Sequence, residues 1–497
     1  MDFRFYLAIF ILGTWILTKL KVQRHFIVFL FKTTKGNFII EWIANISPGF
    51  WKFMADVGVV VSFGGLGGAY LSKHGQRKSL FVVELFLSAG VLCFIFLEHG
   101  FYYLGLSGLL LVGALISFFK AKSQLIDFLS ATALIFLVGV NVFTFMGVEF
   151  SAVKYLILAG SVFGLPAIVL LGLGLNASAI IMQTSTIPGV SPLLPASRGG
   201  NVGVAFPGYD IFIPWWYVLI ALVITLVSHE LAHGILARAQ KLRIKSTGVI
   251  SVGILPIGAF VEPDEEEVKS RPSIDKMRLY SVGSFANLWV CVFAGLTYVL
   301  LVALIAVSMQ VEGLEIVETI EGYPAHGVLT SGTILYEVNG KPVNMDYFFP
   351  GVTPGDKVNL TTDRGLIVLD TVESPENNSK AYIGIYSQQK VGIRQDFIQI
   401  FPWIPANRKS IILYIKSVLF LLTLMKWIVF FNFNIALVNL IPMTPFDGGH
   451  MFRELLSAFN ISEEASKNIV VGVLAFTVLL FLINISPLGV KIAGSVI

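Results

Sequence analysis

The sequence predicts a polytopic α-helical membrane protein that carries a small inserted β-rich domain and a β-hairpin dipping into the membrane. Hydrophobic residues make up 55% of the chain and charged residues 13%, which is about half the charge of a typical soluble protein. The apolar residues gather in runs near the length of about 20 residues that a helix needs to cross a bilayer. The net charge of +4 is too small to indicate a nucleic-acid partner. We therefore expect an integral, multi-pass protein whose surroundings are the lipid bilayer.

The apolar runs are the predicted membrane segments. They lie near residues 5–20, 50–72, 80–97, 101–119, 125–147, 154–175, 213–237, 279–308, 411–441 and 469–486. The first is predicted to be a retained anchor, because it lacks a small-residue cleavage site and basic residues follow it. Residues 26–46 mix aromatic residues with lysines, so an interfacial segment and a poor extra span both remain open. Together, residues 1–175 form a predicted N-terminal multi-span region.

Two segments between the spans have a different composition. Residues 176–212 are rich in Gly, Pro, Ser and Thr, which predicts a loop. The stretch from Gly248 to Val261, GVISVGILPIGAFV, is apolar but short and broken by glycines and a proline. This favours an extended hairpin that dips into the membrane over a crossing helix, and the edge of such a hairpin can pair with an extended substrate. The hairpin belongs to the predicted first part of the membrane core, residues 213–308.

Basic residues predict the orientation of the spans. Clusters at 73–78, 120–122, 238–245 and 269–278 are typical of cytoplasmic ends. The run at 213–237 then passes from the outside to the inside.

The string H-E-L-A-H, from His229 to His233, lies within that run. Two histidines four residues apart share one face of a helix, where neutral imidazoles can hold one Zn²⁺. The intervening Glu230 can act as general base on a water. Since His229 is a little over two turns before Arg238, we expect the site toward the cytoplasmic third of the membrane. The string indicates a metallohydrolase.

A catalytic zinc normally has three protein ligands, and the histidines supply two. Cys93 and Cys291 both fall in apolar runs and support neither a disulfide framework nor a cysteine zinc site. The favoured third ligand is Asp447, a carboxylate at the end of a predicted span, where such groups are costly and rare. A glutamate within Glu262 to Glu267 is the competing ligand. The prediction is one zinc ion per chain.

Residues 309–398 predict the β-rich domain, because short alternating strands are separated by turns there. Their sequence includes GYPAHGVLTSGTILYEVNGKPV, starting at Gly322. This segment resembles a PDZ domain of the kind attached to membrane and periplasmic proteases. Thr333 stands where that pattern usually has Asp. Binding of a peptide and simple screening of the membrane site both remain open. The second part of the membrane core follows as residues 399–497.

The motifs taken together resemble those of the site-2 protease family of intramembrane zinc metalloproteases. The resemblance covers residues from Pro214 to about Phe459. It rests on the H-E-x-x-H string, the segment GAFVEPDEEE, the PDZ-like insert, G-x-x-x-N ending at Asn287, and N-x-x-P-x-x-P-x-D-G starting at Asn439. The resemblance implies that the two motif histidines and Asp447 bind zinc and that Glu230 is the catalytic base. It also implies that the two asparagines engage the substrate backbone, although a cross-link between helices explains either of them equally well.

The predicted function is zinc-dependent hydrolysis of peptide bonds in or near the transmembrane segments of membrane-protein substrates. We expect these substrates to be trimmed beforehand, with the PDZ-like domain acting as a size filter. The resemblance implies an archaeal or bacterial protein, so the expected location is the plasma membrane, with the active site toward the cytoplasm. Two alternatives remain: another membrane zinc metalloprotease with a glutamate as third ligand, and a non-enzymatic transporter or scaffold. The oligomeric state is left open.

Overall fold

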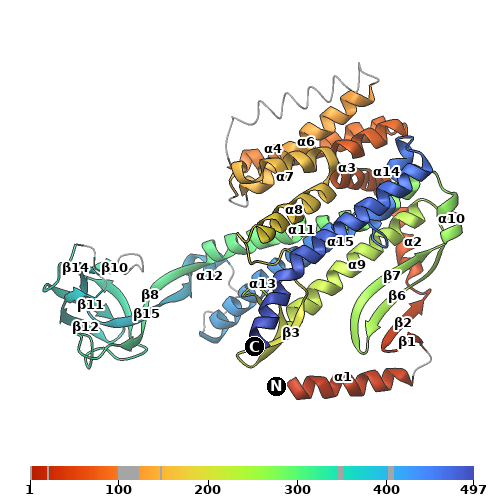
Figure 1. Cartoon of the computed structure of the whole chain (residues 1–497). Helices are drawn as coiled ribbons and strands as arrows, with labels where there is room; N and C mark the ends of the chain where they lie inside the picture. Colours follow the sequence, from red (N-terminus) through yellow and green to blue (C-terminus); the bar gives the residue numbers. More distant parts are fainter. Residues whose placement is uncertain are drawn as a thin grey trace. The chain divides into compact units, whose positions relative to one another are not determined.

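The chain divides into two compact units, one formed by Met1–Gly295 with Leu424–Ile497 and the other by Leu296–Thr423. Figure 1 shows the long helices of the first unit and the strands of the second. This computed structural model describes residues 3–19, 22–98, 123–145, 148–343, 349, 351–375, 377–400 and 408–496. The apolar run predicted at 101–119 lies outside the described residues.

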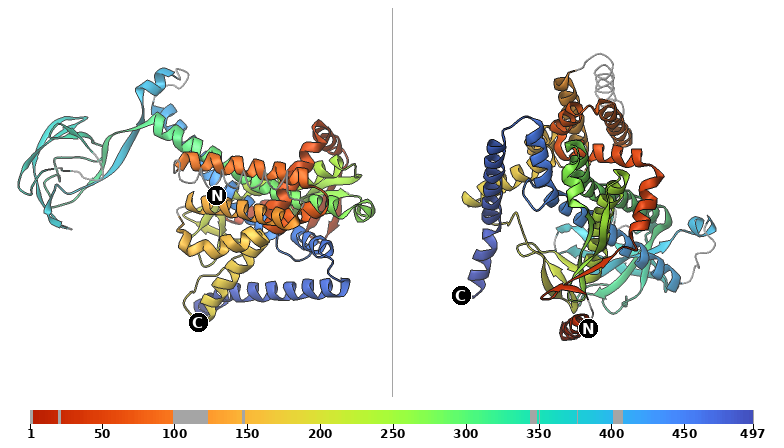
Figure 2. Two further views of the ribbon diagram at one scale, coloured as in Figure 1. Left: turned by 90° about the horizontal axis from the view of Figure 1, so that it is seen from above. Right: turned by 90° about the vertical axis from the view of Figure 1, so that its right-hand side faces the viewer.

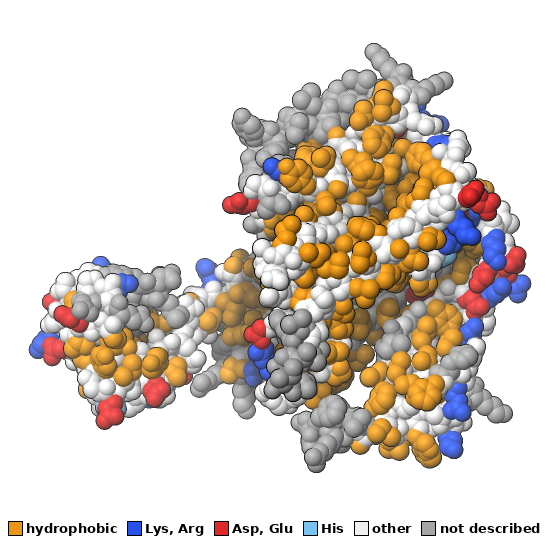
Figure 3. Space-filling view, in the orientation of Figure 1, with side chains coloured by type: hydrophobic (Ala, Val, Ile, Leu, Met, Phe, Trp, Pro, Cys, Tyr) orange, Lys and Arg blue, Asp and Glu red, His pale blue; other side chains and the backbone are white. Residues whose placement is uncertain are grey.

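Among these residues, six helices are long and apolar enough to cross a membrane. They are α3 (Pro48–Lys73), α6 (Gln124–Phe145), α9 (Trp215–Ala239), α11 (Ser273–Ser308), α13 (Arg408–Asn439) and α15 (Glu463–Val496). In Figure 3, apolar side chains cover the visible helices of the first unit, and charged side chains gather near α10 (Glu265–Ser270). A continuous apolar surface of this kind suits hydrocarbon rather than water. The mostly helical fold therefore agrees with the predicted polytopic membrane protein.

The N-terminal region adds further helices around α3. These are α1 (Phe3–Thr18), α2 (Asn37–Ile46), α4 (Arg77–Glu98), α7 (Phe150–Phe163) and α8 (Leu165–Ile181). With 16 residues, α1 is shorter than a span requires. Helix α3 kinks at Gly64, where φ is 57° and a Cβ would lie 2.4 Å from the carbonyl oxygen of Ser161. Glycine is needed there because other residues avoid positive φ and because α7 packs directly against the kink.

A four-stranded antiparallel sheet joins the N-terminal region to the segment that follows α9. Its strands, in order across the sheet, are β1 (Gln23–His25), β2 (Val28–Thr33), β6 (Ile244–Val252) and β7 (Leu255–Pro263). Residues 26–46 are therefore divided between a strand and the short helix α2. Because β2 pairs with β6 along its length, one side of β6 is covered and β7 is the edge strand at that end of the described sheet.

Residues 176–212, predicted as a loop, contain more regular structure. They complete α8 and then form the sheet β3 (Leu194–Arg198), β4 (Asn201–Ala205) and β5 (Phe212–Pro214), with each strand antiparallel to the next. Between β3 and β4, Gly199 and Gly200 have φ of 55° and 77°. Two consecutive residues at positive φ make a two-residue hairpin turn. The Gly199-Gly200 pair was the sequence signal for this hairpin.

The second unit contains a β-domain whose core is formed by buried aliphatic residues such as Leu314, Leu335 and Leu360. Its strands follow the order β12-β11-β9-β8-β15, with β10 paired to β9, and β13 pairs with β14 separately. Their bounds are β8 (Met309–Thr319), β9 (Ile334–Val338), β10 (Lys341–Pro342), β11 (Lys357–Thr362), β12 (Gly365–Asp370), β13 (Val372–Ser374), β14 (Asn377–Tyr382) and β15 (Ile385–Ile393). Helix α12 (Gln395–Ile400) follows.

The last helices of the first unit are α14 (Asp447–Ala458) and α15. A tight turn leads from α13 into α14, and the first residues of α14 must be glycines because the turn packs against them. A Cβ on Gly448 would lie 2.2 Å from the carbonyl oxygen of Leu440, and one on Gly449 would lie 2.5 Å from the carbonyl carbon of Met443. Helix α15 then runs beside α8, as Figures 1 and 2 show, and the amide of Asn484 donates to the carbonyl of Leu173 at 2.9 Å.

Candidate metal centre

Helix α9 carries both histidines of the H-E-x-x-H string. Because His229 and His233 are four residues apart, both imidazoles project from one face of the helix. Their Nε2 atoms lie 3.2 Å from each other. His229 is buried and His233 is half-buried, so the pair is largely removed from water.

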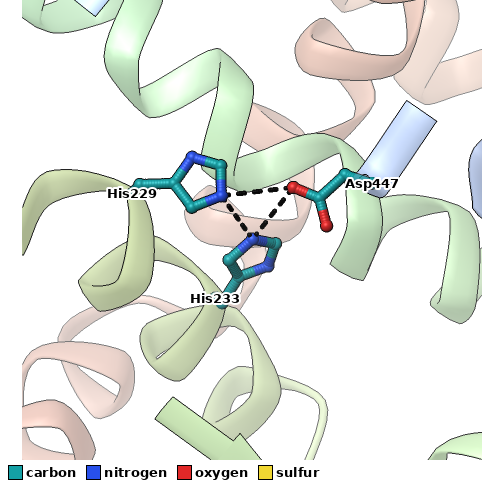
Figure 4. Close-up of side chains that lie close together, drawn as sticks. All are labelled: His229, His233 and Asp447. Carbon is teal, nitrogen blue, oxygen red and sulfur yellow. Dashed lines mark hydrogen bonds and ion pairs between the residues drawn. The ribbon is translucent and has the colours of Figure 1, made fainter. Parts of the chain in front are cut away.

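Asp447, the first residue of α14, completes the cluster. Its Oδ2 lies 3.2 Å from Nε2 of His229 and 3.3 Å from Nε2 of His233, as Figure 4 shows. A tetrahedral zinc with bonds of about 2.0–2.1 Å would hold its ligand atoms ~3.3–3.4 Å apart. The triangle of two nitrogens and one oxygen therefore has the dimensions of a zinc site. This is the one group of His, Cys, Asp and Glu ligand atoms within metal-binding range that the described residues contain.

The protonation of the cluster also suits a cation. The carbonyl oxygen of Leu279 lies 2.8 Å from Nδ1 of His233. Since a carbonyl can only accept, Nδ1 carries the proton and Nε2 presents a lone pair. Oδ2 of Asp447 is buried and receives no hydrogen bond from the residues described. Such a buried carboxylate oxygen, facing imidazole lone pairs, is costly unless a positive charge sits between them.

Helix α11 contacts both imidazoles from two positions eight residues apart, on the side away from Asp447. The Leu279 carbonyl fixes His233, and the amide of Asn287 lies 3.4 Å from Nδ1 of His229. Between them, a Cβ on Gly283 would come within 2.3 Å of Nε2 of His233 and 2.6 Å of the His229 ring. Glycine is therefore required at 283 for α11 to approach the cluster. These contacts orient both rings toward one point.

Glu230 lies on the same helix but has a different partner. Its Oε2 accepts a hydrogen bond of 3.0 Å from the backbone N–H of Val261 in β7. In an antiparallel sheet, a residue directs both its N–H and its C=O to the same side. Val261 therefore turns both groups away from β6, and Ala259, two residues earlier, does the same. The edge of β7 thus faces α9 beside the predicted base.

The glutamates proposed as competing ligands have other partners. Glu262 accepts hydrogen bonds from Ser246 and Lys32, and both lower the pKa of its carboxyl group. Glu267 accepts from the backbone N–H of Arg243. None of the acidic residues from 262 to 267 belongs to the cluster with the two histidines. Of the two candidates for third ligand, the structure brings only Asp447 to the imidazoles.

The two asparagines of the motifs have different surroundings. Asn287 is fully buried and accepts a hydrogen bond of 3.0 Å from Ser228 in addition to its contact with His229. Asn439 is half-buried at the end of α13, and its side chain makes no hydrogen bond with the residues described. Neither Ser228 nor the Leu279 carbonyl was predicted from the sequence as part of the site. A serine beside a motif histidine is a weak signal, and a backbone carbonyl leaves no signal in the sequence.

Helices long and apolar enough to cross a membrane, with two imidazoles and a carboxylate brought together beside a glutamate, are the features of membrane metalloproteases. Sequence comparison identifies the family within that class. The family model described as Peptidase family M50 matches residues 217–482, over half of the chain. The chain therefore belongs to peptidase family M50, the site-2 protease family, which confirms the resemblance seen in the motifs.

Two relatives illustrate how far this similarity extends. An uncharacterized protein of Methanocaldococcus jannaschii is 30% identical over 305 residues, which cover 59% of this chain and 71% of the relative. A membrane-bound transcription factor site-2 protease homolog of Arabidopsis thaliana is 28% identical over 204 residues. That match covers 40% of this chain and 34% of the plant protein, so this chain spans about a third of its length.

Proposed function

We propose that the protein is an intramembrane zinc endopeptidase with His229, His233 and Asp447 as its zinc ligands. The observation that carries this proposal is the triangle of Nε2, Nε2 and Oδ2 atoms, with sides of 3.2, 3.2 and 3.3 Å. It supports a single metal ion held by three protein atoms, which leaves a fourth position open for water or substrate. Membership of the metalloprotease family supports hydrolysis as the reaction.

Bound zinc would lower the pKa of a water to near neutral and polarise the scissile carbonyl. The remaining chemistry falls to Glu230. Because Val261 holds Oε2, the other carboxylate oxygen can take the proton of the attacking water and pass it to the leaving amide nitrogen. The Val261 contact also keeps the carboxylate from rotating. Glu230 is thus the proposed catalytic base.

We propose that the β6–β7 hairpin dips into the membrane and presents the substrate in extended form. A helical peptide is a poor substrate, because its carbonyls are engaged in i to i−4 hydrogen bonds. The N–H and C=O of Ala259, which point away from β6, can hydrogen-bond to an extended chain as in an antiparallel strand pair, next to Glu230. Pairing of this kind would keep an unwound segment near the reacting groups. Substrates with Gly, Pro or Asn in their transmembrane segment should therefore be favoured.

The substrates proposed are single-span membrane proteins whose outer part has been trimmed. The β-domain, proposed to be PDZ-like, lies in sequence between α11 and α13, and this insertion supports a role as a size filter. We propose the plasma membrane of an archaeal or bacterial cell as the location. The basic residues around α10, including Arg243, Lys245 and Lys269, support a cytoplasmic position for that end of α9. The metal centre would then lie toward the cytoplasm.

The proposal is tested with purified full-length protein in detergent and a labelled single-span peptide carrying a central Gly-Pro pair. Glu230→Gln should retain one zinc per chain and lose cleavage. Substitution of His229, His233 or Asp447 by Ala should lose both zinc and cleavage. If the wild-type protein binds no stoichiometric zinc and cuts no such peptide, a transporter or scaffold role replaces the protease.

A further inference from the structure

An apolar cavity of about 660 Å³ lies beside the metal centre in the first unit. Its walls come from α3 and α4 on one side and from α9 and α11 on the other. The α9 wall includes Ser228, Leu231 and Ala232, which flank the motif histidines, and the α11 wall includes Trp289. Since α3 and α4 precede residue 217, where the family match begins, this cavity exists only because the N-terminal helices pack onto the protease core.

Aromatic rings form much of the wall. Phe53 of α3 contacts Phe86 of α4 with ring centroids 6.1 Å apart, and Phe86 contacts Trp289 at 6.0 Å. Trp289 also contacts Phe285 at 6.1 Å. Of these edge-on and tilted contacts, the one between Phe86 and Trp289 links the N-terminal helices to α11.

The cavity offers an occupant no free hydrogen-bonding group from its described lining. The hydroxyl of Ser228 lies 3.0 Å from the carbonyl of Thr225 and 3.0 Å from Oδ1 of Asn287, so it is already engaged. The Nε1 atom of Trp289 has no partner among the described residues, but protein atoms cover it. Apolar cavities of this kind stay dry and accept apolar ligands. The chemistry of the lining therefore selects an alkyl chain.

The position and size of the cavity indicate which alkyl chain. Phe50, Phe86 and Phe293 line it and are 48%, 38% and 64% exposed, so its lining continues onto the outer apolar surface of the helices. The outer surface of membrane-spanning helices is in contact with lipid hydrocarbon. A helix about 10 Å wide fills ~400 Å³ per turn. The cavity would hold less than two turns and is too small for a spanning substrate helix.

We propose that this cavity binds one hydrocarbon chain of a membrane lipid. The chain enters from the bilayer past Phe293 and packs between the N-terminal helices and the catalytic helix. There it contacts the α9 wall next to Ser228, whose hydroxyl is bonded to Asn287. The ligand class is a phospholipid with a long hydrocarbon chain, and the binding contributes to holding α3 and α4 against the core. Because a ligand that binds only the folded state stabilises it, bound lipid raises the melting temperature.

The test uses full-length protein in detergent, titrated with phosphatidylcholine whose acyl chains carry bromine, a contact quencher of tryptophan fluorescence. The Trp289 signal is the difference between wild type and Trp289→Phe. We expect saturable quenching of this signal, competition by the same lipid without bromine, and a rise in melting temperature at the same lipid concentrations. Quenching that grows linearly without saturation, or that unbrominated lipid does not reverse, overturns the proposal.

A matched pair of variants locates the binding. Val290→Phe adds a ring inside the cavity and should abolish most of the saturable quenching, whereas Val292→Phe adds the same ring to the exposed face of α11 and should leave it intact. Ala286→Leu fills the cavity from another position, in case the first variant folds poorly. Each variant is compared at equal zinc content. Equal quenching in the filled and control variants, or displacement by a single-span peptide without any displacement by lipid, contradicts a hydrocarbon-chain site.

Discussion

The side-chain amide of Asn287 lies 3.4 Å from Nδ1 of His229, on the opposite side of the ring from the Nε2 that faces Asp447. A histidine that binds a metal through Nε2 carries its proton on Nδ1 and needs an acceptor there. The oxygen and nitrogen of an amide occupy nearly equivalent positions. Asn287 can therefore turn its oxygen to His229 and its NH₂ group to Ser228. The amide then fixes the tautomer and the direction of the ligand.

Replacing Asn287 by Ala should lower zinc affinity by about 10- to 100-fold, the usual effect of losing the partner of a ligand histidine. Asn287→Asp keeps an acceptor and should retain most of the affinity. Zinc affinity is measured by competition with a chelator. The control is Asn432→Ala, which removes another buried asparagine, one bonded to its own helix at Ile428. If Asn287 serves the substrate instead, zinc affinity stays unchanged and KM rises.

Gly283→Ala should abolish zinc binding while leaving the helices intact. The added Cβ would lie 2.3 Å from Nε2 of His233, which is inside van der Waals contact, so the rings or α11 must move away. Gly295→Ala on the same helix is the matched control, because a Cβ there meets nothing within 4 Å. Zinc content by mass spectrometry and helix content by circular dichroism are compared. A zinc-loaded Gly283→Ala protein would contradict the close approach of α11.

Substitutions at two acidic residues test which of them is the third zinc ligand. Asp447→Asn should reduce zinc content far below one per chain, because it removes the charge that faces the two imidazoles. Glu262→Gln should leave zinc content unchanged, since Glu262 is bonded to Ser246 and Lys32 instead. The reverse result would favour the alternative metalloprotease class with a glutamate ligand.

Asp56 of α3 should be essential for the stability of the first unit. Both of its carboxylate oxygens accept hydrogen bonds of 2.7 Å from Arg278 of α11, and the two side chains are 1% and 7% exposed. Asp56→Asn removes the carboxylate closest to the buried Arg278, whose remaining ion pair with Asp275 is longer at 3.8 Å, and breaking a buried ion pair costs about 3–5 kcal/mol. The melting temperature in detergent should fall sharply. Asp396→Asn, which removes an exposed partner of Arg394, should change it little.

Arg278 shows that a cluster of basic residues in the sequence does not reveal which of its side chains is buried. Its cluster at 269–278 predicts a cytoplasmic end of a span. Within this cluster, the structure buries Arg278 against Asp56, a residue 222 positions earlier in the chain. Sequence patterns record the type of a side chain but not the partner that a distant helix brings to it.

Local chemistry was readable from the sequence alone. Apolar runs of spanning length determined the membrane class, because hydrocarbon tolerates only a backbone that satisfies its own hydrogen bonds. The spacing of His229 and His233 determined that they share a helix face. What only the tertiary structure decided is how separate helices meet. The fold brings Asp447 rather than Glu262 to the histidines. It also packs Gly283 and Asn287 against the imidazole rings and places the N–H of Val261 next to Glu230. These contacts depend on helix packing and turn geometry across hundreds of residues, so the motifs that favoured Asp447 and Asn287 indicated their roles but not the contacts themselves.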